Sequence, residues 1–489
     1  MNKSYLDRLK QFLVKHISRL ELVFVWLAIA SFITFIMKIG FNLPEWLNGV
    51  LHSLNTLILI YFCFYTLARL FQSEAKIAFI KQYKVSFVLV FLFLLDVCLN
   101  IYSLGNDATF FVFESKEHVS YTIFSAITQF FVFFSLFSGQ FSFLSRLEAL
   151  QLSPTKLFLA SFIVLILFGT LLLSLPNSTV NGISFIDALF TSTSAVCVTG
   201  LIVLDTSTDF TRTGQGIILF LIQMGGLGII TISSFFAYVG GQKSRLKNSM
   251  IVKELLQTDH LVNVNRVLIR VISTTLIIES VGAFILYIYW GNESSNIFEA
   301  VFFAVSAFCN AGFSLYSDSF MTVHSDFFSL FLISLLIILG GLGMGTLSEI
   351  RHYFFASSTE RKIFRFSIGS KFVLNGTWIL LGVGTLLFFI SEYSASMASY
   401  GVLEKVKHSF FQSVVSRTAG FNSVDFSQLI IPTTFWYIAF MFIGGASGST
   451  AGGVKVNTVS VMFVWLKTIL LRRKTCVVYG RTLAVNSFH

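Results

Sequence analysis

Residues 191–201, TSTSAVCVTGL, form a run of small side chains between two long apolar segments. An unpaired backbone carbonyl inside a lipid bilayer costs several kcal/mol, so irregular backbone survives there only where protein, water or a dehydrating cation satisfies it. Val198 and its neighbours favour extended backbone, and Gly200 can adopt angles that other residues avoid. The stretch is therefore predicted to be a re-entrant pore loop whose carbonyl groups replace the hydration shell of a potassium-sized ion.

Two further stretches repeat this pattern: SAFCNAGFS at 306–314 and SRTAGFN at 416–422. In all three, a serine precedes a glycine by four to six positions, and an apolar segment lies on each side. A single match of this kind is more often a plain turn between helices. Repeated hairpins of helix, loop and helix can enclose an axis, which one hairpin cannot do, so the repetition favours a pore.

A fourth stretch, GGASGSTAGG at 444–453, places five glycines, two serines and a threonine in ten positions of an apolar segment. Glycine costs about 1 kcal/mol per helical site relative to alanine. A simple kink would need only one or two glycines. This segment is therefore predicted to be unwound.

The four stretches VCVTGL, AFCNAGFS, SRTAGFN and GGASGSTAGG, in this order, resemble the first three filters and the intramembrane gate of the Trk/Ktr/HKT superfamily of potassium and sodium transporters. The resemblance extends from about residue 153 to the end of the chain. It implies an all-α polytopic membrane fold built from helix–pore loop–helix hairpins in a pseudo-fourfold array, of which three are found here.

The resemblance also implies the site residues. The expected ion-binding filter residues are Val196, Cys197, Val198, Thr199, Gly200, Phe308, Cys309, Asn310, Ala311, Gly312, Ser416, Arg417, Thr418, Ala419 and Gly420. The expected gate residues are Gly445, Ala446, Ser447, Gly448, Ser449, Thr450, Ala451, Gly452 and Gly453.

The function implied by the resemblance is potassium uptake across the cell membrane, with K+ as the transported ion and no covalent cofactor. The three expected filter positions, 200, 312 and 420, all hold glycine. In the family this favours potassium, whereas a serine at the first filter position is associated with sodium. The membrane potential would drive uptake, at about 2.3 kcal/mol per charge per 100 mV, with ion coupling left open. A homodimer and a cytosolic nucleotide-binding regulatory subunit are the implied partners, besides the lipid bilayer.

Composition supports a membrane protein. The 489 residues are 55% hydrophobic and 12% charged, which excludes an ordinary soluble domain. A membrane-spanning helix needs about 20 mostly apolar residues. Such windows lie near 22–40, 49–71, 85–103, 120–141, 157–176, 215–239, 268–290, 327–348, 371–391 and 433–466.

Charge predicts the orientation of these spans. Lys and Arg gather before the first span and after every even-numbered one, which places the N-terminus and those connections in the cytoplasm by the positive-inside rule. The pore loops then lie on the outer side of a multi-pass protein. The net charge of +10 follows from the inner connections and does not require a nucleic-acid partner.

The chain is expected to divide into five parts. These are a four-helix extension at 1–150, pore hairpins at 151–241, 242–350 and 351–475, and the start of a truncated fourth repeat at 476–489. A ring of three filters cannot close a coordination shell, so the fourth is expected either beyond a truncated end or from another chain. A non-conducting regulatory membrane subunit is the alternative function, and a transporter of an organic solute is a weaker one.

Asp96 and Glu279 are acids within predicted spans, and Arg417 is a base within the third predicted pore loop. Asp96 is expected to be functional or bonded to a neighbour such as Asn100. Glu279 could line an ion path, or it could pair with Arg270 or with another hairpin, and these possibilities stay open. Arg417 would repel cations if it faced the pore, so its side chain is expected to point behind the loop. Five scattered cysteines and the lack of a nucleophile motif argue against a disulfide framework, a zinc site and an enzyme.

Overall fold

The computed structural model describes residues 23–41, 43–73, 76–82, 86–87, 90–91, 154–228, 264–291, 294–472, 476–479 and 481–483. These residues belong to two compact units, the first holding the described residues up to 91 and the second those from 154 onward. Nearly all of the predicted span 85–103, all of the span 120–141, and Asp96 lie outside the described residues.

The first unit contains a helix at Val23–Gly40, α2 at Glu45–Gln72 and α3 at Lys76–Gln82. The ring of Phe24 stacks on that of Tyr65, with centroids 4.9 Å apart. Thr34 Oγ1 donates a 2.7 Å hydrogen bond to Asn55 Oδ1, which joins the two helices through buried polar side chains.

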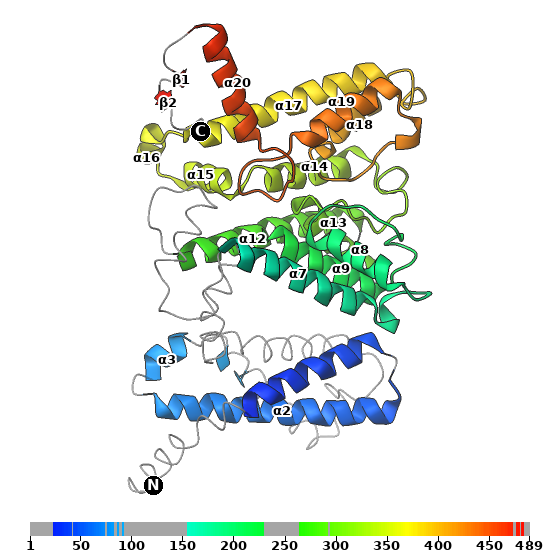
Figure 1. The fold of residues 1–489 in the computed structure, drawn as a ribbon, viewed down its shortest axis with the longest axis vertical. Coiled ribbons are helices and arrows are strands. Elements are labelled where there is room, and N and C mark those ends of the chain that lie inside the picture. The colour runs from blue at the N-terminus through cyan, green and yellow to red at the C-terminus, as the bar shows by residue number, and fades with distance from the viewer. Residues whose placement is uncertain are drawn as a thin grey trace, which may run out of the picture. The chain divides into compact units, whose positions relative to one another are not determined.

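The second unit is built from three hairpins, each with a long first helix, a short middle helix and a third helix. Their bounds are α7 Pro154–Leu173, α8 Phe185–Val196 and α9 Arg212–Gly226; α12 Val264–Trp290, α13 Ser294–Phe308 and α14 Phe327–Gly341; and α17 Ile368–Glu392, α18 Val402–Val415 and α19 Ile431–Phe442. In every hairpin the short helix packs against the long first one (Figure 1). Single 3-10 turns occur at Pro176–Ser178 and Phe426–Gln428.

Local sequence explains where these helices begin. Ser184 Oγ accepts from the Asp187 N–H at 3.1 Å before α8, and Asp326 Oδ2 accepts from the Ser329 N–H at 3.0 Å before α14. Ser367 caps α17 in the same way. A side-chain oxygen at this position satisfies one of the four N–H groups that a helix start leaves unpaired.

The predicted span 327–348 is not one straight helix. It breaks after α14, and α15 at Met344–Phe355 is inclined by 108°. Gly343 joins the two with a φ of +76°, a conformation that costs glycine little. The short helix α16 follows at Ser358–Ile363.

The predicted span 433–466 is also interrupted. It consists of α19, an irregular segment at 443–455 and α20 at Val456–Leu470. Beyond it, β1 at Cys476–Val478 and β2 at Arg481–Leu483 form a small antiparallel pair, within the stretch assigned from sequence to a fourth repeat.

Four described helices are long and apolar enough to cross a membrane, and the bent pair α14–α15 would add a fifth. The four are Val23–Gly40, Glu45–Gln72, Ile269–Trp290 and Ile368–Glu392. Shorter apolar helices are also present, α8 and part of α13 among them. A mostly helical, polytopic membrane architecture is the result.

Aromatic packing holds the second and third hairpins together. Phe303 on α13 contacts Phe320 at a centroid distance of 5.0 Å, and Phe320 contacts Phe421 at 5.5 Å. All three side chains are fully buried. Since Phe421 directly follows the third filter glycine, this core fixes the third loop beside the second.

Candidate functional site

The first pore loop begins where α8 ends at Val196. The helix is closed by a 2.8 Å bond from the Cys197 N–H to the Thr193 carbonyl, and the Thr199 N–H then donates to the Ser194 carbonyl at 2.8 Å. The second loop repeats the latter bond, from Ala311 to Ser306 at 2.8 Å. Val196 and Phe308, predicted as the first filter residues, are therefore the last residues of their helices.

The three loops share one backbone pattern. The glycines predicted as filter residues are left-handed, with φ of +77°, +73° and +84° at Gly200, Gly312 and Gly420. The residue two positions earlier is left-handed as well, with φ of +54°, +57° and +68° at Val198, Asn310 and Thr418. Extended backbone was expected from the β-branched Val198, and the loop imposes a conformation that such a residue rarely adopts alone. The repetition marks these loops as equivalent parts.

The loops meet at their glycines. A Cβ added to Gly200 would collide with the Ala311 carbonyl oxygen. One added to Gly312 would lie 2.7 Å from the Ala419 oxygen and 2.9 Å from the Gly420 Cα. The backbones of neighbouring loops therefore come so close at these glycines that no side chain would fit. The sequence pattern could suggest special backbone at each glycine, but not that the three loops meet there.

Three helix ends point their partial negative charge at this meeting point. The short helices α8, α13 and α18 finish at Val196, Phe308 and Val415, immediately before the loops. The C-terminal end of a helix carries about half a negative charge, so each end favours a cation nearby. Within the described residues, no group of three His, Cys, Asp or Glu side chains is placed to hold a metal ion. The helix ends supply partial negative charge from their backbone carbonyls.

Arg417 lies in the third loop with 5% of its surface exposed. Its Nη2 donates to Thr377 Oγ1 on α17 at 3.5 Å, so the side chain runs back toward the first helix of its own hairpin. This is the direction expected from its charge.

Exposure differs sharply between the loops. Cys309, Asn310 and Ala311 of the second loop are buried, whereas Cys197 and Thr199 of the first are exposed. The second hairpin packs against both of the others, through α9 on one side and α18 on the other. The first loop is thus left open along one side.

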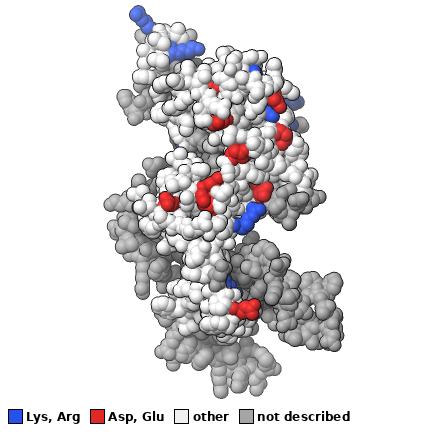
Figure 2. Space-filling model, turned by 90° about the vertical axis from the view of Figure 1, so that its right-hand side faces the viewer, with Lys and Arg blue, Asp and Glu red and all other residues white. Residues whose placement is uncertain are grey.

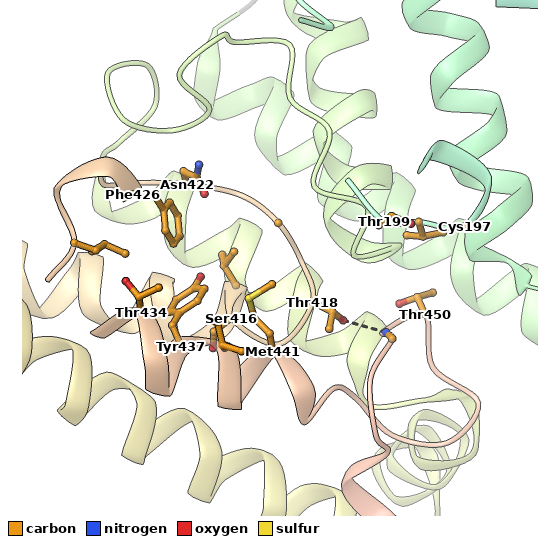
Figure 3. A pocket seen from close by; sticks show the side chains of 16 residues that line it. Cys197, Thr199, Ser416, Thr418, Asn422, Phe426, Thr434, Tyr437, Met441 and Thr450 are labelled. Atoms are coloured by element: carbon orange, nitrogen blue, oxygen red, sulfur yellow. Dashed lines mark hydrogen bonds between the residues drawn. The ribbon is translucent and has the colours of Figure 1, made fainter. Parts of the chain in front are cut away.

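A cavity of about 750 Å³ lies on that open side. As Figure 3 shows, Cys197 and Thr199 come from the first loop, Ser416 and Thr418 from the third, and Thr450 from the irregular segment. Tyr437 and Met441 of α19 complete one wall. The cavity therefore lies between the first and third loops, whereas the second and third loops are in direct contact.

The irregular segment at 443–455 contacts two of the loops from one side. Thr450 Oγ1 donates to the Phe308 carbonyl at 3.0 Å. The Gly452 N–H donates to Thr418 Oγ1 at 3.0 Å, a bond drawn in Figure 3. The segment predicted as the gate therefore holds the end of α13 and the third loop by specific hydrogen bonds.

The same segment is joined to the break between α14 and α15. The Ala446 N–H donates to the Gly341 carbonyl at 2.8 Å, and the Met344 N–H donates to the Gly448 carbonyl at 3.2 Å. Lys455 Nζ donates to the Ala451 carbonyl at 2.7 Å, which anchors the end of the segment. Two unwound stretches thus satisfy each other's backbone groups, as irregular backbone at membrane depth requires.

Acidic side chains lie in the connections that follow the loops, and Figure 2 shows acidic residues spread over one face of the described chain. Hydrogen bonds from Ser427 hold the pKa of Asp425 below its usual range. Burial opposes ionisation of Asp205, but hydrogen bonds from Ser317 and Ser207 outweigh it and lower its pKa. Both carboxylates are therefore ionised at neutral pH and attract cations toward the connections that carry them.

Some contacts could not be predicted from sequence. The carbonyls of Val196 and Phe308 fit against Gly225 and Gly340, where an added Cβ would collide with them. The paired glycines of GGLG at 225–228 and GGLGMG at 340–345 predict helix packing or a bend, but not the partner. The carboxyl of Glu279, for which an ion path and Arg270 were both considered, lies instead beside the Cys309 thiol.

Known proteins resemble this chain in sequence and in fold. Residues 123–473 match the TrkH family, described as a cation transport protein. Ktr system potassium uptake protein B of Vibrio alginolyticus is 39% identical over 335 residues, covering 67% of this chain and 72% of that protein. Its namesake in Bacillus subtilis is 37% identical over 338 residues, covering 68% and 74%. Potassium/sodium uptake protein NtpJ of Enterococcus hirae is 36% identical over 339 residues, with the same coverage of 68% and 74%.

The crystal structure of the potassium transporter TrkH from Vibrio parahaemolyticus is similar with a TM-score of 0.53 and 17% identity, covering 88% of this chain and 79% of that one. At that identity the likeness speaks for the fold alone, and it confirms the all-helical polytopic expectation. The relatives are named as ion transporters, which confirms that a non-enzymatic role was the right expectation.

Proposed function

The chain belongs to the TrkH family of cation transport proteins, and we propose that it takes up potassium across the cell membrane through a pore lined by its three glycine loops. The observation that carries this proposal is the repeated left-handed pattern at Gly200, Gly312 and Gly420, with the three glycines in backbone contact. Carbonyl groups presented by such loops can replace the hydration shell of an ion. The names of the relatives support potassium as that ion.

The filter residues of this proposal are those expected from sequence, with Val196 and Phe308 contributing the last carbonyls of their helices. Sodium is the second candidate ion, because one relative is named for potassium and sodium together. The three loops all keep glycine, and potassium is therefore the ion we assign.

The irregular segment at 445–453 acts as the gate in this proposal. It spans from the α14–α15 break to the end of α13 and the third loop, and its bonds to Phe308 and Thr418 support a position across the proposed ion route. Opening requires those two bonds to break, so the closed state is stabilised by each of them.

The cavity beside Cys197 is the place for a fourth hairpin in this proposal, whichever chain supplies it. The second loop is covered on both sides and the first on only one. A non-conducting membrane subunit is the second candidate function, and the same open side favours it, since three loops leave an ion exposed to whatever fills the fourth position.

The protein is placed in the cell membrane with its N-terminus and even-numbered connections inside, so the loops face outward and the membrane potential drives uptake. A homodimer and a cytosolic nucleotide-binding subunit that presses on the gate complete the proposal. The bent helix α15 and the basic residues near it would receive such a subunit.

Growth of a potassium-uptake-deficient bacterium at limiting potassium tests the proposed function. The chain is expressed alone and together with a fourth hairpin taken from a relative. Rescue in either case supports potassium uptake, and rescue only with the added hairpin assigns the cavity to it. Failure of both, with the protein present in the membrane, favours the non-conducting alternative.

A further inference from the structure

The residue three positions before the glycine occupies the same place in the second and third loops, whereas its counterpart in the first loop, Cys197, is exposed and lines the cavity. In the second loop it is Cys309, and in the third it is Arg417. A Cβ on Gly226 would collide with the Cys309 side chain, and one on Gly341 would lie 3.9 Å from Arg417 Nη2. Each of these side chains therefore passes beside a glycine of the preceding hairpin.

Both side chains end at the first helix of their own hairpin. Arg417 Nη2 donates to Thr377 Oγ1 of α17 at 3.5 Å. The Cys309 thiol donates to Glu279 Oε1 of α12 at 3.7 Å. The same position thus connects loop to first helix in two repeats, through different chemistry.

Glu279 stands out among the buried acids. Its side chain is 4% exposed, and no ion pair of its carboxyl is found in the described part of the chain. The polar side chains that face this carboxyl are Gln223 of α9 and Cys309. Glu392, which is 0% exposed, accepts from the backbone N–H groups of Ser396 at 3.2 Å and Ile430 at 3.1 Å, so its carboxyl organises a connection. An acid inside a membrane-spanning helix is costly and marks a functional position unless its surroundings account for it.

We infer that Glu279 is a positioning residue for the second filter, which it holds through the Cys309 thiol. Cys309 lies between Phe308, the last residue of α13, and the left-handed Asn310, so a force on its side chain acts on the turn that aims the second-filter carbonyls. The Phe308 carbonyl is held on the other side by Thr450. The second loop is therefore fixed from behind by α12 and from below by the gate.

This inference rests on the proposed function, because positioning of carbonyls matters for ion choice. Small displacements of coordinating oxygens change the balance between a larger and a smaller ion. Loss of the contact between Glu279 and Cys309 is therefore expected to alter ion selectivity more than the maximal transport rate.

The test compares substitutions that remove the contact with substitutions that keep it. Glu279→Leu removes the acceptor and Cys309→Ala removes the donor, whereas Glu279→Gln and Cys309→Ser retain them. Each removal is expected to raise the KM for potassium about fivefold and to lower the potassium-to-sodium preference, with maximal rate changed less than twofold. The double variant is expected to be no worse than the stronger single one, since both remove one interaction. Glu392→Gln is the matched control, which should lower thermal stability without changing ion preference.

A second readout does not depend on transport. In a chain whose other cysteines, Cys63, Cys98, Cys197 and Cys476, are serine, Cys309 should react slowly with a maleimide in membranes and at least about fivefold faster after Glu279→Leu. Unchanged labelling and unchanged ion preference after Glu279→Leu, or independent effects that multiply in the double variant, would overturn the inference. A chain that transports no potassium would contradict the proposed function. The labelling result would still show whether Glu279 holds Cys309 in place.

Discussion

At the scale of single residues, the filter glycines carry the account. Each is left-handed, and Gly200 and Gly312 face backbone oxygen where any side chain would collide. Their role as filter residues stays a prediction. Sequence was sufficient to predict their special backbone, because glycine in a small-residue run between apolar helices is a strong signal of it. It was insufficient for Val198, Asn310 and Thr418, whose left-handed angles are imposed by the surrounding loop.

Gly200→Ser is predicted to impair potassium selection. The new Cβ must displace the Ala311 oxygen, and a left-handed serine is strained by about 1 kcal/mol or more. We expect the KM for potassium to rise about tenfold, while sodium uptake persists. Competition of sodium with potassium uptake measures this. Gly216→Ala, at a helical glycine with open space around it, is the control; equal effects of the two substitutions would remove Gly200 from the filter.

Arg417 and Glu279 show how far the charge of a residue alone predicts the position of its side chain. A guanidinium inside a cation path is unfavourable, and that alone predicted its backward direction correctly. Glu279 has no such unique answer, because an acid can serve a path, a partner or a brace, and only the three-dimensional contact with Cys309 distinguishes them.

At the scale of elements, the gate and the α14–α15 break form one unit. Composition predicted that residues 444–453 would be unwound, since five glycines cannot hold a helix. The glycine run at 340–345 predicts either close helix packing or a bend, and the structure has both: the Phe308 carbonyl lies against Gly340, and the chain bends by 108° at Gly343. The reciprocal bonds between the two segments explain why both are irregular.

Thr450→Val is predicted to open the gate more often. It removes the hydroxyl that binds the Phe308 carbonyl at 3.0 Å, a bond worth about 1 kcal/mol. Initial uptake rates should rise about fivefold, and deletion of residues 445–453 should raise flux further. Thr450→Ser keeps the donor and should resemble the unchanged chain. Equal rates for the valine and serine variants would show that this bond does not hold the gate.

Gly343→Ala is predicted to destabilise the protein by about 2 kcal/mol, because the residue is left-handed and its Cβ would lie 2.7 Å from the Ser447 oxygen. Gly345→Ala, two positions away in helical α15 with open space around it, should be neutral or stabilise by up to about 1 kcal/mol. Thermal unfolding of the purified protein measures both. Similar shifts in the two variants would mean that the break is not a fixed part of the fold.

At the scale of the whole molecule, three hairpins surround the loops incompletely. Sequence predicted three repeats by counting loop motifs, and membrane hydropathy predicted the helical architecture. It could not predict which loop would be open. That follows from the order of packing, in which the second hairpin contacts both of its neighbours and the cavity of about 750 Å³ separates the other two.

Cys197 provides a probe of that open side. It is exposed and lines the cavity, whereas Cys309 at the equivalent position is buried. A small thiol reagent should therefore label Cys197 rapidly. Labelling should fall at least about tenfold when a fourth hairpin is supplied, since a helix would cover the position as α9 covers Cys309. Unchanged labelling with a hairpin that restores transport would place that hairpin elsewhere.

The most direct test of the central claim is the flux of radioactive rubidium, a potassium analogue, into proteoliposomes under an imposed inside-negative potential. The fourth hairpin is supplied, and the original sequence is compared with Gly312→Val and Gly216→Ala. The account predicts potential-driven flux for the original sequence and Gly216→Ala, and at least about a hundredfold less for Gly312→Val, because its Cβ would enter the backbone contact between the second and third loops. Equal flux through all three, or none through any while the protein is folded in the membrane, would contradict a pore lined by these glycine loops.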